Sequence, residues 1–140
     1  MSATVARLGR QGRNGAGALR KILDEYAADA RLTDSDREKM MMQIFRRHGL
    51  PKPIPQYVVR HNGRFIARVD AALPQYKISF EYQSYQWHMG KRAIERDNRR
   101  RRKLQAVQWT EIGVTGADLR SGGAEMCAEI FEIIRNASAA

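Results

Sequence analysis

The centre of the chain has the short alternating pattern of β-strands, and this pattern limits the fold more than any other feature. Apolar segments at residues 57–59 and 65–69 flank Asn62-Gly63, a dipeptide that favours the backbone of a two-residue hairpin turn. Residues 76–83 then alternate apolar and polar side chains, as a half-buried strand does. The sequence therefore predicts three consecutive strands of one sheet.

Helical patterns precede these strands. Apolar side chains recur at helical spacing over residues 17–30, which predicts a first helix there. They belong to Leu19, Ile22, Leu23 and Tyr26. Ser35 and Glu38 fit a capping box, so a second helix is expected to start near them and to end before Gly49. Residues 1–16 combine Gly and Arg with little apolar periodicity, and we interpret them as a flexible basic arm.

Three further elements follow the strands. A basic helix is expected over residues 91–105, a short strand over 107–112 and an amphipathic helix around residues 127–134. The resulting order ααβββαβα predicts an α/β fold, in which helices flank a central mixed sheet. A chain of this length is long enough for one hydrophobic core, so we expect residues 17–140 to form a single domain.

The chain is strongly basic. Its 140 residues include 25 Lys and Arg against 15 Asp and Glu, which gives a net charge of +10 and an isoelectric point near 10.4. Such an excess attracts polyanions, of which DNA and RNA are the commonest. An anionic membrane surface is the alternative, but the sequence has no basic helix with a Trp- and Leu-rich face. The composition therefore favours nucleic acid as the partner.

The sequence also bears on the cellular compartment. No apolar run is long enough to span a bilayer, and no apolar signal core follows the basic residues 1–13. Cys127 is the single cysteine, so the chain can form neither an intramolecular disulfide nor a zinc site built from cysteines. We expect a cytoplasmic protein.

Two carboxylates occupy strand positions from which they could share one cation. Alternation places Val69 and Ala71 on one side of their strand and Asp70 on the other, while Glu81 and Gln83 share a side of the next strand. Adjacent antiparallel strands would bring Asp70 and Glu81 together, where their oxygens could hold Mg²⁺. Beside a phosphodiester, such an ion polarises the phosphoryl oxygen and activates water. Alternatively, the two are ordinary solvated carboxylates on an exposed sheet face.

A third carboxylate belongs to the second helix. Glu38 precedes Met41, Met42 and Phe45 at helical spacing, which puts it on or beside the apolar stripe of that helix. A carboxylate that faces the interior is costly unless it is paired or binds a metal. Glu38 is therefore either a third acid that supports the site or simply the capping-box partner of Ser35.

The helix over residues 91–105 concentrates positive charge. It holds eight Lys or Arg against two acids, and so many like charges repel one another unless an anion binds. The alternative is a solvated face without a ligand. We predict phosphate contacts from Arg92, Arg96, Arg99, Arg100, Arg102 and Lys103. Asp97 and Arg101, near the apolar stripe of Ile94 and Leu104, are expected to form a structural ion pair.

Together these features resemble the PD-(D/E)xK, or restriction-endonuclease-like, superfamily, and within it the small domains related to very-short-patch repair endonucleases. The resemblance covers about residues 33–120 and depends on five motifs in matching order and spacing. The motifs are Ser35-x-x-Glu38 with Gly49-Leu50-Pro51-x-Pro53, then Arg68-Val69-Asp70, residues 78–88 with Glu81 and His88, Arg96-Asp97-x-x-Arg100-x-x-x-Leu104, and Gln108-Trp109.

The resemblance implies a restriction-endonuclease-like fold and a nuclease that depends on Mg²⁺ or Mn²⁺ and hydrolyses phosphodiester bonds, most directly in DNA. It implies that Asp70 and Glu81 are metal ligands and that Glu38 is an accessory acid. His88, seven positions after Glu81, would contact the scissile phosphate.

Two positions depart from the family pattern. Gln83 stands where the superfamily commonly has Lys and the closest relatives have an acid, and Ser84 stands where Gly is usual. Gln83 can hydrogen-bond the attacking water, but it cannot carry charge or act as a base at neutral pH. A second hypothesis is therefore a non-catalytic nucleic-acid-binding module derived from a nuclease fold. A third is a nuclease whose specificity or regulatory partner is a separate protein, because no recognition helix-turn-helix is apparent.

Overall fold

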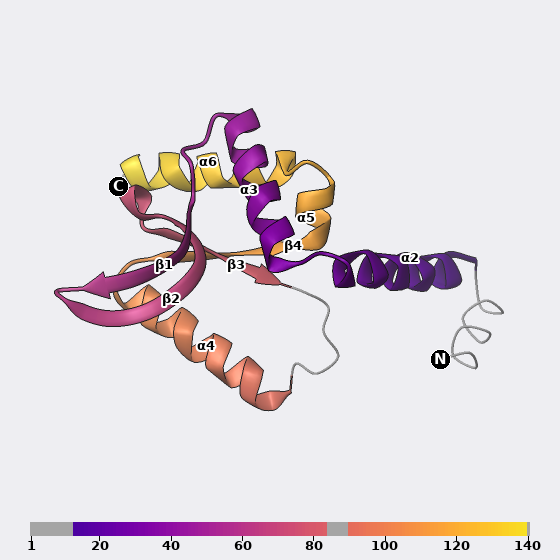
Figure 1. Ribbon diagram of the computed structural model, residues 1–140, viewed down its shortest axis with the longest axis horizontal. Helices are drawn as coiled ribbons and strands as arrows, with labels where there is room; N and C mark the ends of the chain where they lie inside the picture. The colour runs from indigo at the N-terminus through magenta and orange to yellow at the C-terminus, as the bar shows by residue number, and fades with distance from the viewer. Residues whose placement is uncertain (1–12, 84–89, 140) are drawn as a thin grey trace.

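The computed structural model describes residues 13–83 and 90–139, which form a four-stranded sheet flanked by helices (Figure 1). In chain order the elements are α2 (Arg13–Ala30), α3 (Asp34–His48), β1 (Ile54–His61), β2 (Arg64–Leu73), a 3₁₀ turn (Pro74–Tyr76), β3 (Ile78–Gln83), α4 (Lys91–Ala106), β4 (Thr110–Thr115), α5 (Gly116–Arg120) and α6 (Ala124–Ala139).

The sheet is mixed. Its strand order is β1-β2-β3-β4, with antiparallel pairing from β1 to β3 and parallel pairing of β3 with β4. A parallel neighbour requires a crossover connection, and α4 lies within it. The predicted α/β class, the helices around a mixed sheet and the element order are confirmed, and the structure adds the short helix α5.

Two apolar clusters attach the helices to the sheet. In the first, α3, α5 and α6 pack against β3 and the end of β2, and the rings of Phe45 and Phe80 meet edge to face with centroids 5.3 Å apart. In the second, Leu104 of α4 packs with Trp109 against the β1–β2 hairpin. Trp109 is only 8% exposed, so it is a core residue. The two clusters give the sheet one face toward α3 and α6 and another toward α4.

The hairpin forms where the sequence predicts it. Asn62 and Gly63 join β1 to β2 with φ angles of 52° and 78°, which is the left-handed backbone that a two-residue hairpin turn requires. Both strands are longer than the apolar segments alone indicated, since β1 spans Ile54–His61 and β2 spans Arg64–Leu73.

The alternation of side chains changes phase within β2. Ala67 and Val69 belong to the cluster on the α4 side, whereas Ala71 belongs to the opposite cluster. The prediction that Val69 and Ala71 share a face is therefore wrong. The change coincides with Gln56 of β1, which lies opposite Asp70 and has a φ of 49°. Asp70 thus occupies an irregular position of the ladder.

The N-terminus of α3 differs from the prediction. Thr33, not Ser35, is the capping residue: its side chain accepts a hydrogen bond from the backbone of Asp36 over 3.0 Å, and the Asp36 carboxylate accepts one from the backbone of Thr33 over 3.0 Å. The capping box predicted from Ser35 and Glu38 is wrong because the same motif occurs two residues earlier, where the backbone is extended. The predicted end at Gly49 is confirmed, with a φ of 80°.

The starts of two other elements differ from the prediction. Helix α2 already begins at Arg13, so residues 13–16 are helical, and the rest of the predicted arm lies outside the described residues. Strand β4 begins at Thr110, three residues later than expected, because α4 continues to Ala106 and Gln108 turns the chain with a φ of 66°. Within the described ranges, no helix combines the length and the apolarity needed to cross a membrane.

Candidate active site at the end of the β2–β3 ladder

Asp70 and Glu81 come together where β2 and β3 cease to pair. The antiparallel register joins Ala71 to Phe80, and one further step along both strands puts Asp70 opposite Glu81. Oδ2 of Asp70 accepts a hydrogen bond from the backbone N of Tyr82 over 2.8 Å. The Asp70 and Glu81 side chains also share a hydrogen bond. The structure therefore places the two carboxylates side by side, as alternation on adjacent antiparallel strands predicts.

The contact changes the protonation of Glu81. Burial and the charge of Asp70 raise the pKa of Glu81 from 4.5 to about 8, against the opposing effect of Arg100. Two touching carboxylates ionise together only at a high cost, so they hold a proton between them near neutral pH. A divalent cation would relieve the same repulsion by taking the place of that proton.

Arg100 reaches this pair from α4. Its Nη2 lies 3.5 Å from Oε1 of Glu81 and 3.2 Å from Oε1 of Glu111. Its Nη1 lies 3.1 Å from Oδ1 of Asp97. Burial alone would lower the pKa of Arg100, but the hydrogen bond to Glu111 and the charges of its carboxylate neighbours raise it. The structure thus places a permanent positive charge beside Glu81.

Sequence reasoning missed Glu111. This residue pairs with Ser79 across the parallel ladder, and its side chain is 3% exposed. The expected strand ended at residue 112, so the alternation of Glu111 with Gly113 and Thr115 on one face was not visible. That alternation was the available signal, and it places Glu111 on the same sheet face as Glu81 and α4.

Gln83 lies over the backbone of β4. A Cβ built at Gly113 would collide with the amide of Gln83, whose Cδ would be 2.7 Å away. Gly113 pairs with Glu81 in the parallel register, so the Gln83 amide lies beside the acidic pair on one sheet face. The absent side chain at Gly113 makes room for the amide at this position.

Glu38 approaches the site from the other face of the sheet. It is half-buried on α3, and its charge contributes to raising the pKa of Tyr82, after burial and the charge of Asp70. Tyr82 follows Glu81 in β3 and packs toward the α3 side. Glu38 therefore shares Tyr82 with Asp70 as a neighbour, and its predicted capping role belongs to Asp36 instead.

The donors at this site suit a small, hard cation. Within residues 13–83 and 90–139, no group of three or more His, Cys, Asp or Glu side chains converges as a metal site would. Mg²⁺, however, is usually bound by one or two carboxylates together with waters and substrate phosphates. Asp70 and Glu81 fit that smaller set of donors. His88, the predicted contact of the scissile phosphate, lies outside the described residues, as does Ser84.

The cations of α4 divide into two groups. Arg100 is half-buried among carboxylates, whereas the other predicted phosphate-binding side chains of this helix are exposed. The exposed ones are Arg92, Arg96, Arg99, Arg102 and Lys103. They form a basic face whose helix is attached to the sheet beside Glu81.

Two predictions about the inner face of α4 are wrong. Asp97 pairs with Arg100 at a spacing of three residues, and Arg101 is exposed instead of pairing with it. Ile94 is 50% exposed and does not continue the apolar stripe of Leu104. The helix is rotated so that Arg100, whose partners Glu81 and Glu111 lie on the sheet, faces inward together with Leu104.

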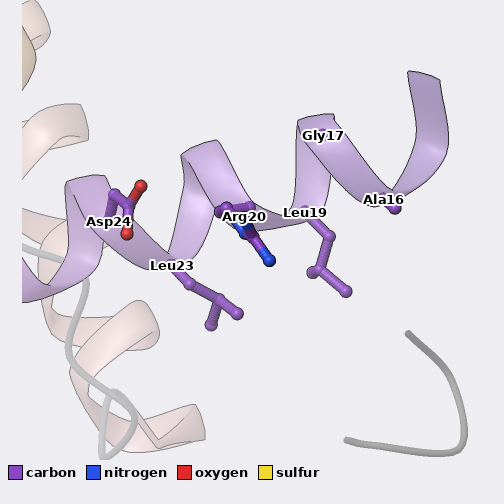
Figure 2. Close-up of a pocket in the computed structure, with 6 residues that line it drawn as sticks. All are labelled: Ala16, Gly17, Leu19, Arg20, Leu23 and Asp24. Carbon is purple, nitrogen blue, oxygen red and sulfur yellow. The ribbon is translucent and has the colours of Figure 1, made fainter. Parts of the chain in front are cut away.

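A surface pocket lies apart from this site. All of its lining residues belong to α2, and Figure 2 shows the Leu19 and Leu23 side chains on the same side of this helix. Its lining residues are Ala16, Gly17, Leu19, Arg20, Leu23 and Asp24. Asp24 and Arg20 are the charged members of the lining, so the pocket has no acid pair like that of Asp70 and Glu81.

Comparison with known proteins gives relatives without a described activity. Two proteins of Mycobacterium tuberculosis, from strains CDC 1551 / Oshkosh and H37Rv, are each 35% identical to this chain over 121 residues. Both are named only as uncharacterized proteins. The match covers 86% of this chain and 44% of each relative, so the chain spans less than half the length of these proteins. No family model and no solved structure matches the chain significantly.

Proposed function

We propose that this protein is a metal-dependent nuclease that hydrolyses phosphodiester bonds, most directly in DNA. One observation carries the proposal: Asp70 and Glu81 share a hydrogen bond at the end of the β2–β3 ladder, and the pKa of Glu81 is raised to about 8. Perturbed carboxylates in contact are more typical of functional sites than of solvated surfaces. The resemblance of these strands to the PD-(D/E)xK superfamily supports the same assignment.

Mg²⁺ or Mn²⁺, when bound, would supply Lewis acidity toward the phosphodiester and the attacking water. Asp70 and Glu81 would hold the ion. The chain's other residues would do the positioning: the amide of Gln83 can orient a water by hydrogen bonding, and the exposed cations of α4 can bind the phosphate backbone. Glu38 and His88 are the accessory acid and the phosphate contact in this proposal.

Calorimetry tests the metal site without depending on turnover. We expect Mn²⁺ to bind the wild-type protein at pH 7 with release of about one proton, which titrations in two buffers of different ionisation enthalpy detect. Asp70→Asn and Glu81→Gln should each abolish binding. Glu129→Gln, at an exposed position of α6, is the matched control and should bind as the wild type does. Equal Mn²⁺ binding by all four proteins would overturn the metal assignment.

Cleavage assays test the activity itself. Supercoiled plasmid and single-stranded DNA should be cut with Mg²⁺ or Mn²⁺ by the wild-type protein and by Glu129→Gln, but not by Asp70→Asn. A cleavage product that persists in Asp70→Asn would show that the nuclease activity has another source.

A second candidate function is a nucleic-acid-binding module without catalysis. The observation that favours it is Arg100, whose guanidinium already lies 3.5 Å from Glu81, near where a cation would bind. The presence of Gln83 where the superfamily usually has lysine also favours this second function. This function predicts salt-sensitive binding of nucleic acid that is the same with Mg²⁺ and with a chelator, and no cleavage under either condition.

A further inference from the structure

The β1–β2 hairpin is a second basic element, separate from α4. Residues 39–69 contain seven Lys or Arg and no Asp or Glu. Three of these cations, Arg60, Arg64 and Arg68, are exposed on the hairpin, and Phe65 beside them is 55% exposed. Figure 1 shows the closed end of the hairpin reaching beyond the helices. The surface therefore combines uncompensated positive charge with an exposed apolar ring.

Among the described residues, the hairpin packs on α4 as far as Val59 and Ala67, and its closed end is exposed. Val59, Ala67 and Val69 pack against Leu104 of α4, and the residues from Arg60 to Phe65 are all exposed. Arg68 lies between Ala67 and Val69, so it points away from α4, and its partner across the ladder is Val58. The cations are thus distributed over the ribbon and not gathered on the face that α4 covers.

We infer that this hairpin enters the major groove of a DNA duplex. The inference depends on the proposed nucleic-acid function and names its substrate class as duplex DNA. A two-stranded ribbon fits the major groove of B-DNA, which is about 12 Å wide, and cations on its two sides can meet the phosphates of both groove walls. The major groove of an RNA duplex is too narrow for such a ribbon.

The spacing of the hairpin and the acidic pair suits one continuous duplex. Arg64 and Asp70 are six residues apart on β2, which corresponds to about 20 Å at 3.3 Å per residue. That length spans roughly six base pairs at 3.4 Å each. A duplex that lies with one strand near Asp70 can therefore present its major groove to the end of the hairpin, with Phe65 available for a thymine methyl group.

The test measures binding in the absence of divalent metal, so that cleavage is not needed. The triple variant Arg60→Gln/Arg64→Gln/Arg68→Gln should bind a 20-base-pair DNA duplex on the order of tenfold more weakly or worse, and the slope of log K against log salt should fall by about 2 to 3. The charge-control variant Arg31→Gln/Arg46→Gln/Arg135→Gln removes the same charge from exposed positions outside the hairpin and α4, and it should leave both quantities near wild type.

Two further measurements distinguish binding in the major groove from non-specific electrostatic attraction to the DNA. Phe65→Ala should weaken duplex binding without changing the salt slope, because it removes no charge. An RNA duplex of the same sequence should bind more weakly than DNA and be indifferent to the hairpin triple variant. Unchanged melting temperatures would show that the hairpin still folds.

The outcomes distinguish this inference from the proposed function. If the α4 variant Arg99→Gln/Arg102→Gln/Lys103→Gln loses DNA binding while the hairpin variant matches its charge control, the hairpin inference is wrong and nucleic-acid binding stands. If the wild-type protein binds no nucleic acid at low salt, both are wrong. Equal loss with DNA and RNA duplexes would also overturn entry into the major groove.

Discussion

Nη2 of Arg100 lies 3.2 Å from Oε1 of Glu111, an ion pair in which the carboxylate side chain is only 3% exposed. The same nitrogen lies 3.5 Å from Oε1 of Glu81, so the buried Glu111 and Glu81 of the candidate site share one guanidinium. Removing Arg100 would leave Glu111 charged and buried without compensation.

We therefore expect Arg100→Met to lower the free energy of unfolding by about 3 kcal/mol at pH 7. The double variant Arg100→Met/Glu111→Gln should recover most of that loss, because it leaves no uncompensated charge. Urea unfolding measures both. Arg101→Met, at the exposed neighbouring position, is the control and should change stability by less than about 0.5 kcal/mol. A loss as large in the control would refute the special role of the buried pair.

The raised pKa of Glu81 predicts how stability varies with pH. Its pKa is about 8 in the folded protein and 4.5 as the ordinary value, so the folded state retains a proton that the unfolded chain has released between these limits. The contribution of Glu81 to stability is therefore fully present below pH 4.5 and is lost as the pH rises to about 8. Urea midpoints measured from pH 5 to pH 8.5 should fall less steeply in Glu81→Gln than in the wild type. An unchanged profile in that variant would contradict the raised pKa.

The close approach of Gln83 to Gly113 predicts a compensating pair of substitutions. Gly113→Ala should displace the Gln83 amide, which ends an exposed and flexible side chain, so it should cost less than about 1 kcal/mol. In the background of Gln83→Ala the same substitution should cost much less, because the colliding amide is gone. Thermal unfolding of the four proteins gives this coupling. Additive effects would show that the amide does not lie over Gly113.

The cap of α3 gives a prediction independent of any function. Thr33→Ala removes the side chain that accepts the hydrogen bond from the backbone of Asp36, and it should cost about 1 kcal/mol. Ser35→Ala, two residues later and exposed, should be close to neutral. If Ser35→Ala destabilised the protein more than Thr33→Ala, the capping residue would be Ser35, as the sequence alone predicted.

Local patterns predicted much of this structure because they depend on near neighbours. Asn62 and Gly63 fix the hairpin, and period-two alternation places Glu81 and Gln83 on one face of β3. The phase change in β2 was beyond such patterns, because it coincides with the left-handed backbone of Gln56 on the neighbouring strand. The sequence of one strand does not show an irregularity in the backbone of the strand that pairs with it.

The candidate site divides in the same way. The meeting of Asp70 with Glu81 follows from two adjacent strands joined by a short connection. Arg100 and Glu111 come from later elements, and their partnership depends on how α4 is rotated and on where β4 begins. The rotation of α4 and the start of β4 both depend on tertiary packing around Leu104 and Trp109. Residue spacing along the sequence does not predict such packing.

The parallel crossover through α4 also has a consequence for the order of assembly. The β2–β3 pairing closes a short loop, whereas the β3–β4 pairing joins residues about thirty positions apart and costs more chain entropy to close. We expect the two carboxylates to meet during folding before Arg100 and β4 arrive. For that interval the acids face each other without a guanidinium, so refolding should be faster in mildly acidic buffer, where a shared proton holds them together, than above pH 8.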